Sequence, residues 1–158
     1  MSQDSAATKP TNGPVAPGEL CWLEVPCVDP ERAFSFYQAV FGWAKPCNTD
    51  GPIPGYGEGI DSIHTFMHGK LYGAFVKMSN ADNVAVTVDQ ELPFKMPITP
   101  YLLVADLDKT AAVVAASGGK VHVPKFACGP GGAMGHAARF IDTEGNVVAV
   151  WTPPVGKC

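Results

Sequence analysis

The 158-residue sequence lacks the patterns typical of secreted, membrane-spanning or nucleic-acid-binding proteins. Its five cysteines are scattered and never spaced as CxxC, so neither a disulfide framework nor a structural zinc site is indicated. No window reaches the roughly 18 apolar residues of a membrane span, and no apolar signal-peptide run is present. The 11 Lys and Arg residues do not cluster, and the net charge is -4. We therefore expect a cytoplasmic protein with no nucleic-acid and no membrane partner.

Glycine and proline, by contrast, are abundant, with 17 and 15 residues respectively. This composition implies many turns and therefore short strands, and it disfavours a helical bundle. The chain is long enough for one domain of ordinary size, which buries about two thirds of its unfolded surface without needing a covalent staple.

The strongest local signal is a capped amphipathic helix in the stretch VPCVDPERAFSFYQAVFGW. Asp29 is a good N-cap because its carboxylate can accept from the unpaired amide groups of a helix start, and Pro30 gives up a donor that had no partner there. Gly42 can adopt the left-handed conformation that ends a helix. Apolar residues at helical spacing predict one buried face. These residues are Ala33, Phe36, Tyr37, Val40 and Phe41.

Short strands and one further helix are expected along the rest of the chain. In the first strand, Trp22 and Glu24 share one face, and the aliphatic residues of the other face should meet a helix. The second helix begins at Asp106 or Asp108 and ends at Gly118 and Gly119. The strands are predicted at residues 20–26, 43–47, 62–67, 70–78, 98–105, 120–124, 137–142 and 147–152, with an additional edge strand at 84–88 and a long loop at 48–59.

The two halves of the chain repeat the same order of elements. Asp106 follows Asp29 by 77 residues, and Gly119 follows Gly42 by the same 77. A repeat of this length is too long for a solenoid unit, so it indicates a duplicated βαβββ module. The predicted organisation is a disordered leader at 1–18, a first module at 19–80, a connector at 81–97, a second module at 98–154 and a tail at 155–158.

The motifs VDPERAFSFYQAVFGW and FIDTEGNVVAVWTP resemble the two ends of the vicinal oxygen chelate superfamily. This group includes glyoxalase I, bleomycin and fosfomycin resistance proteins, and extradiol dioxygenases. The resemblance covers about residues 19–154. It implies an α+β fold in which two tandem βαβββ modules form a cupped mixed sheet, with helices on the convex face and a ligand in the cup, commonly in a dimer.

The resemblance also implies where a metal would be held. Metal-using members take ligands from the first and last strands of each module, so that substrate oxygens can coordinate a divalent cation. In this sequence those places correspond to Trp22, Gly73, Pro100 or Tyr101, and Ala149. None of these residues is a usual metal ligand, and moving the assumed register by one residue does not bring a metal-ligating side chain to these places. Glu24 is the sole plausible donor, so we predict no metal cofactor, with a divalent metal as the alternative.

Aromatic and mostly uncharged side chains are expected to line the cup, as in many small-molecule pockets. The predicted ligand contacts are Trp22, His64, Phe75, Tyr101 and Trp151, with Lys77, Leu103 and Val147 on the same face. The alternative is that these residues fill the interior of a sheet that encloses no cavity.

Three residues are candidates for proton transfer: Glu24, Tyr101 and His136. His136 follows the loop CGPGGAMG and enters a strand that should line the cup, and an imidazole titrates near neutral pH. The competing interpretation is that His136 caps the loop through a backbone hydrogen bond.

The favoured hypothesis is a homodimeric, metal-free member of the superfamily that binds a small aromatic or apolar metabolite. It would either sequester this metabolite or catalyse proton transfer or rearrangement. One alternative is a metal-dependent lyase, isomerase or dioxygenase that draws on Glu24, His64 and His136. The other is a non-catalytic interaction protein with a collapsed cup.

Overall fold

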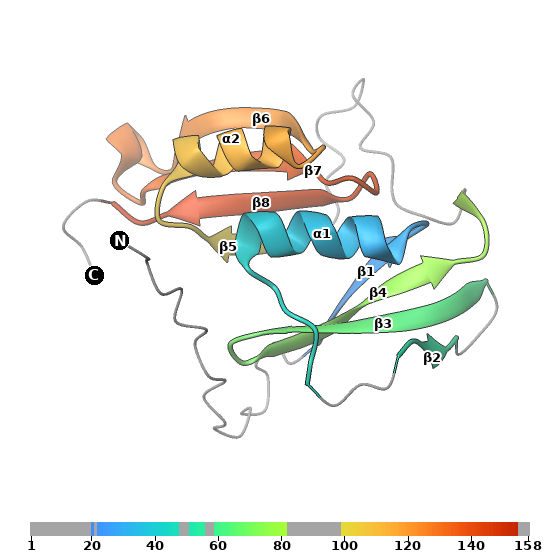
Figure 1. Cartoon of the computed structure of the whole chain (residues 1–158). Helices are drawn as coiled ribbons and strands as arrows, with labels where there is room; N and C mark the ends of the chain where they lie inside the picture. Colours follow the sequence, from blue (N-terminus) through green and yellow to red (C-terminus); the bar gives the residue numbers. More distant parts are fainter. Residues whose placement is uncertain (1–19, 21, 48–50, 56–58, 82–98, 155–158) are drawn as a thin grey trace, which may run out of the picture.

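Two four-stranded sheets, each with one long helix, make up the part of the chain that the structure describes (Figure 1). The computed structural model describes residues 20, 22–47, 51–55, 59–81 and 99–154. The first module contains β1 (Trp22–Cys27), α1 (Pro30–Phe41), β2 (Ile53–Pro54), β3 (Ile60–His68) and β4 (Leu71–Met78). The second contains β5 (Tyr101–Leu103), α2 (Leu107–Ala116), β6 (Lys120–Ala127), the short 3-10 helix η2 (Pro130–Gly132), β7 (His136–Ile141) and β8 (Val147–Thr152).

The two modules share one topology. The strand orders are β1-β4-β3-β2 and β5-β8-β7-β6. In each module the first strand runs parallel to the last, and the other neighbours are antiparallel. The predicted α+β fold with two tandem βαβββ modules is therefore confirmed.

Both helices begin at an aspartate that caps them. The Asp29 carboxylate accepts from the Arg32 amide at 3.0 Å, and Asp106 accepts from two amides of the first turn of α2. Gly42 ends α1 in the left-handed conformation, at φ 71°, and its amide donates to the Gln38 carbonyl. These contacts satisfy amide and carbonyl groups that a helix end leaves without an internal partner.

The predicted elements differ from the structure mainly between α1 and β3. The strand predicted at residues 43–47 is wrong, because Ala44 forms only an isolated bridge with Met67. The partner of β3 is instead β2, at Ile53–Pro54, inside the predicted loop. The edge strand predicted at 84–88, the leader, the tail and most of the predicted connector lie outside the described residues.

Both helices pack on the same side of the sheets and lie side by side (Figure 1). One buried cluster joins them to both sheets. It includes Val25, Phe36 and Phe75 from the first module, and Val114 and Phe140 from the second. Because side chains alternate along a strand, the residues between the core positions lie on the opposite side. We call that side the helix-free face; it carries Trp22, Glu24, Tyr72, Tyr101, Arg139, Ala149 and Trp151.

Trp43 lies at the centre of the aromatic core of the first module. Its ring stacks on Tyr37, with centroids 4.4 Å apart, and on Phe66 at 4.2 Å. The side chain is almost completely buried. Since Tyr37 belongs to α1 and Phe66 to β3, the indole fixes the helix against the sheet.

The turn between β7 and β8 is organised by the buried carboxylate of Asp142. Its oxygens accept from the Tyr37 hydroxyl at 2.9 Å, from the Asn146 side chain at 3.0 Å and from the amides of Glu144 and Asn146. The Asn146 side chain also donates to the Pro26 carbonyl at 2.9 Å. The turn of the second module is thereby tied to the first module.

Glu144, in the same turn, completes the contact between the modules. Its carboxylate accepts from the amides of Val28 and Asp29 and from the Arg32 guanidinium, 2.7 Å away. Burial opposes the negative charge of Glu144, but the hydrogen bonds from Arg32 and the two amides outweigh burial and lower its pKa. A lowered pKa stabilises the fold above the usual value of 4.5, and this stabilisation is lost as the pH falls through the folded-state pKa.

Candidate functional site

In the first module, the helix-free face presents two exposed aromatic rings beside a carboxylate. Trp22 of β1 and Tyr72 of β4 are partners in the parallel pair, and they are 42% and 40% exposed. The Trp22 indole donates to the Glu24 carboxylate over 3.3 Å. The roles predicted for Trp22 and Glu24 in binding or proton transfer stay predictions, but both side chains are accessible from solvent.

In the second module, Tyr101 and Arg139 meet across Ala149. Both residues are neighbours of Ala149 in the sheet, one on β5 and the other on β7. Arg139 Nη2 donates to the Tyr101 hydroxyl at 3.2 Å, and its guanidinium carbon lies 5.9 Å from the centroid of the Phe126 ring. Because the side chain of Ala149 is a single methyl group, the two longer side chains can bridge it. A guanidinium and a phenol thus lie together among aromatic rings.

Trp151 and His136 take different positions near the glycine-rich loop. The Trp151 indole donates to the Met134 carbonyl at 2.8 Å. Alternation along β7 places His136 on the opposite side from Arg139, and its ring rests against the loop, where a Cβ at Gly132 would lie 3.1 Å from His136 Cε1. The prediction that His136 lines the cup is therefore wrong.

Phe75 is a core residue of the helix side and does not contact the predicted cup. Its ring is fully buried and packs against α1, with centroids 5.4 Å from Tyr37 and 6.2 Å from Phe34. Lys77 follows Phe75 on the same face, and its Nζ lies 3.7 Å from a carboxylate oxygen of Asp61. The predicted placement of Phe75 and Lys77 on the cup face is wrong, because β4 turns its other side chains to that face.

The positions that hold a metal in the superfamily do not offer a matching set of donors here. Gly73 faces the helix side, where a Cβ would collide with the Leu23 carbonyl and the Phe66 ring. On the helix-free face, the neighbour of Glu24 on β4 is Ala74. Over the described ranges, no three His, Cys, Asp or Glu side chains gather as metal ligands would. These side chains do not fit the family's metal centre, since a divalent cation needs several such donors.

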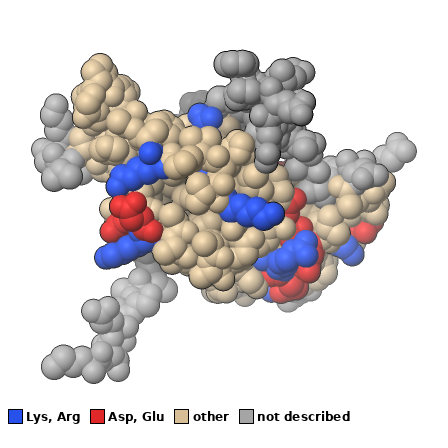
Figure 2. All heavy atoms as spheres, turned by 90° about the horizontal axis from the view of Figure 1, so that it is seen from above, with Lys and Arg blue, Asp and Glu red and all other residues tan. Residues whose placement is uncertain are grey.

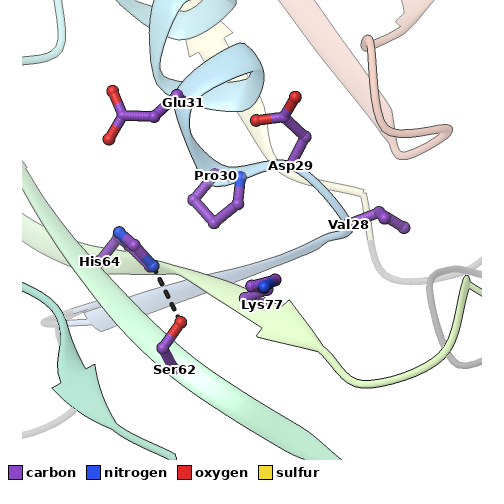
Figure 3. A pocket seen from close by; sticks show the side chains of 7 residues that line it. All are labelled: Val28, Asp29, Pro30, Glu31, Ser62, His64 and Lys77. Carbon is purple, nitrogen blue, oxygen red and sulfur yellow. Dashed lines mark hydrogen bonds between the residues drawn. The ribbon is translucent and has the colours of Figure 1, made fainter.

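His64 lines a separate cleft on the helix side of the first sheet (Figure 3). The cleft has a volume of about 410 Å³ and lies between β3, β4 and the start of α1. Its lining residues are Val28, Asp29, Pro30, Glu31, Ser62, His64 and Lys77. His64 Nε2 and Ser62 Oγ are 2.9 Å apart. The structure thus separates His64 from the aromatic residues with which it was predicted to act.

We expect His64 to titrate below its ordinary value of 6.5. Partial burial lowers the pKa of His64, and it outweighs the opposite effect of the Glu31 carboxylate. Because the unfolded chain binds this proton more readily, the fold should lose stability as the pH falls through about 6.5. NMR titration of the His64 imidazole measures the pKa directly. A midpoint at or above 6.5 would contradict this assignment.

Two variants next to this imidazole provide matched controls for the titration. Glu31→Gln removes a charge that raises the pKa of His64, so the midpoint should fall further. Lys45→Gln removes a charge that lowers it, so the midpoint should rise. If the His64 midpoint shifted in the same direction in both variants, a conformational change, and not the removed charges, would be the cause.

Charged residues of both signs are interspersed over the face seen in Figure 2, with no stripe of one sign across it. Charged side chains of the described residues also form pairs of opposite sign, such as Lys45 with Glu31 and Lys125 with Asp108. This pattern is unlike the continuous basic surface that follows a phosphate backbone. In the part of the chain that the structure describes, no helix combines the length and apolar character needed to cross a membrane.

Paired βαβββ modules with a helix-free face that carries aromatic residues define a known class of small α+β proteins, and the sequence identifies the family. The sequence model of the Glyoxalase/Bleomycin resistance protein/Dioxygenase superfamily matches residues 20–150. This protein belongs to that superfamily, as its opening and closing motifs predicted.

Curated relatives also carry glyoxylase names. A glyoxylase-like domain-containing protein of Didymella fabae is 31% identical over 141 residues, which cover 87% of this chain and 95% of that protein. The putative glyoxylase CFP32 of Mycobacterium bovis is 30% identical over 131 residues, or 82% of this chain. The match spans only 44% of CFP32, so this chain corresponds to less than half of that relative.

Solved structures share the fold at low sequence identity. A glyoxalase/bleomycin resistance protein/dioxygenase family enzyme from Burkholderia phytofirmans superposes with a TM-score of 0.62 at 18% identity, covering 86% of this chain and 99% of that one. A domain of the same description from a Frankia species gives 0.63 at 12% identity, covering 88% and 100%. These matches support the fold and carry no statement about substrate.

Proposed function

We propose that this protein binds a small aromatic molecule with a hydrogen-bond acceptor on its helix-free face, without the metal centre used by metal-dependent members of the superfamily. The observation that carries the proposal is the contact between Arg139 and Tyr101 across Ala149. The guanidinium supplies fixed donors for a carboxylate, carbonyl or phenolate oxygen. A homodimeric assembly and a cytoplasmic location are part of this proposal.

The surroundings of this pair favour a ligand with an aromatic body. Trp151 shares the face with Tyr101, and Phe126 lies under the Arg139 guanidinium. Small-molecule sites commonly combine such apolar and aromatic walls with a few oriented polar groups. Either sequestration or metal-free proton transfer is compatible with this arrangement, with Tyr101 and Glu24 as the groups that would handle a proton.

The residues at the metal positions support a metal-free site. The predicted positions Trp22, Gly73, Pro100 or Tyr101, and Ala149 include no carboxylate, imidazole or thiolate, and neither does Ala74, the β4 neighbour of Glu24 on the helix-free face. Glu24 alone provides a single ligand, and its carboxylate is engaged by the Trp22 indole. A divalent cation held by one carboxylate would be bound too weakly to organise a reaction.

Arg139→Ala should weaken binding of the ligand about tenfold or more, because a hydrogen bond to a charged group contributes about 1.5–3 kcal/mol. The ligand is first sought by native mass spectrometry of the purified protein and by a thermal-shift screen of aromatic carboxylates, phenols and quinones. Calorimetry then compares the affinities of the parent, Arg139→Ala and Tyr101→Phe. Arg32→Ala is the control, because it removes a guanidinium on the helix side.

Three outcomes would overturn the proposal. Elemental analysis showing one tightly bound nickel, zinc, iron or manganese per chain, with binding abolished by chelation, would favour a metal-dependent lyase, isomerase or dioxygenase. Equal ligand affinities for the parent and Arg139→Ala would show that the Arg139 guanidinium does not contact the ligand. Failure of every compound to bind, together with capture of a protein partner through Trp22 and Tyr72, would favour an interaction protein.

A further inference from the structure

A second cleft opens where the two modules meet at the end of α1. It has a volume of about 530 Å³, within the range of about 300–1,000 Å³ typical of small-molecule sites. Figure 1 shows the C-terminal end of α1 beside β5 and the connection into α2. The lining residues are Val40, Phe41, Trp43, His68, Leu102, Leu103, Val104, Ala105, Asp106, Lys109 and Thr110.

The walls of this cleft are mainly apolar. Val40 and Phe41 come from the last turn of α1, and Leu102, Leu103 and Val104 come from β5 and the residue after it. By alternation along β5, Leu103 turns toward the helix-free face beside Trp151, whereas Leu102 lies on the helix side with Val150. Leu102, Val40 and Phe41 are only partly buried, so part of their apolar surface remains in water. An apolar group that entered the cleft would remove this surface from solvent and would contact both modules at once.

The polar groups at the cleft leave a cation available. The Asp106 carboxylate accepts from the amides of Asp108 and Lys109, and these bonds to the helix start hold its pKa below the ordinary value. Lys109 Nζ is 3.9 Å from Asp106, at the limit of an ion pair, and the lysine side chain is 85% exposed. The Lys109 ammonium can therefore move to a ligand with little loss of existing contacts.

We propose that this cleft binds a small amphipathic anion, with an apolar chain or ring against Val40, Phe41 and Leu102 and a carboxylate on Lys109. The apolar walls select the body of the ligand, and the exposed Lys109 ammonium selects its charge. This site is distinct from the helix-free face around Arg139, because its lining shares no residue with the contact between Arg139 and Tyr101. The proposal thus adds a second binding site to the one proposed above.

Decanoate is a suitable probe, and decanol is its uncharged counterpart. Calorimetry should show that decanoate binds the full-length protein about tenfold or more tightly than decanol, as expected for one charge-assisted contact. Lys109→Glu should weaken decanoate binding at least tenfold, and Ala105→Glu should do the same by placing a carboxylate among the residues that line the cleft. Both side chains are exposed, so the fold should tolerate these changes. Amide NMR shifts on titration should centre on Val104 and Thr110.

Two control variants separate this cleft from other effects. Lys120→Glu makes the same charge change at the start of β6, away from the cleft, and should leave the decanoate affinity within twofold of the parent. Arg139→Ala should also leave it within twofold. If Lys120→Glu and Lys109→Glu weakened decanoate binding equally, the net charge of the protein would explain the effect, and the proposal would be overturned. Loss of decanoate binding in Arg139→Ala would assign the probe to the helix-free face, and absence of binding by the parent would refute the site.

Discussion

Asp142→Ala is expected to destabilise the protein by about 4 kcal/mol, because it removes the acceptor of one buried and several part-buried donors, and a buried donor left without an acceptor costs about 1–3 kcal/mol. The donors are the Tyr37 hydroxyl, the Asn146 side chain and the amides of Glu144 and Asn146. For a domain of this size the midpoint of thermal unfolding should fall by about 8–16 °C. Calorimetric melting of the purified variant measures this change.

The matched control is Asp106→Ala, another aspartate that accepts from two backbone amides. Asp106 is solvent-accessible, so water can replace its carboxylate, and the decrease in melting temperature should be much smaller. Asp142→Asn should be intermediate, because Oδ1 can still accept from the two amides of the turn. Equal effects of Asp142→Ala and Asp106→Ala would contradict the role assigned to the buried carboxylate.

Trp43→Ala is expected to cost about 3–5 kcal/mol, as for other large aromatic residues truncated in a core. The change opens a cavity between α1 and β3, and Tyr37 and Phe66 lose the ring against which both stack. Chemical denaturation followed by circular dichroism gives the free energy of unfolding. The denaturant midpoint should fall with little change in the slope.

Two further tryptophan variants test whether burial of the Trp43 ring in the core is the cause of this loss of stability. Trp22→Ala removes an indole that is 42% exposed, and it should change the free energy of unfolding by less than about 1 kcal/mol. Trp43→Phe keeps a ring in the stack and should recover part of the lost stability. If Trp22→Ala were as destabilising as Trp43→Ala, the helix-free face would have to be a second core.

Local signals in the sequence were sufficient for the helix ends and for the duplication. Asp29, Gly42 and Asp106 act on neighbours within one turn, so their roles depend only on residues nearby in the chain. The repeat of 77 residues then placed the same elements in both halves. The fold class followed from these features together with the opening and closing motifs.

The orientation of β4 could not be obtained in this way. Its four central residues, Gly73, Ala74, Phe75 and Val76, are all buried, so no polar alternation distinguishes its two faces. A shift of one residue exchanges the faces of a strand, and this shift moved Phe75 and Lys77 to the wrong side. The collision that a side chain at Gly73 would meet becomes visible only once β1 and β3 are in place.

Contacts between residues distant in the chain were also invisible from the sequence. Arg139 is the one Arg or Lys residue in the β7 sequence HAARFI, and its hydrogen-bond partner Tyr101 is 38 residues away in the chain. Arg32 and Glu144 are 112 residues apart. No local pattern links such pairs, although the alternation of β7 could have suggested that Arg139 and Ala137 share a face.

The unequal burial of the tryptophans gives the protein intrinsic fluorescent reporters of two different processes. Trp43 is shielded from water and stacked between rings, so its emission should lie at short wavelength and shift to the red when the core opens. Trp22, on the helix-free face, should already emit at longer wavelength and respond to quenchers dissolved in water. Excitation of one chain, without any added dye, can thus follow unfolding through Trp43 and events on the helix-free face through Trp22 and Trp151.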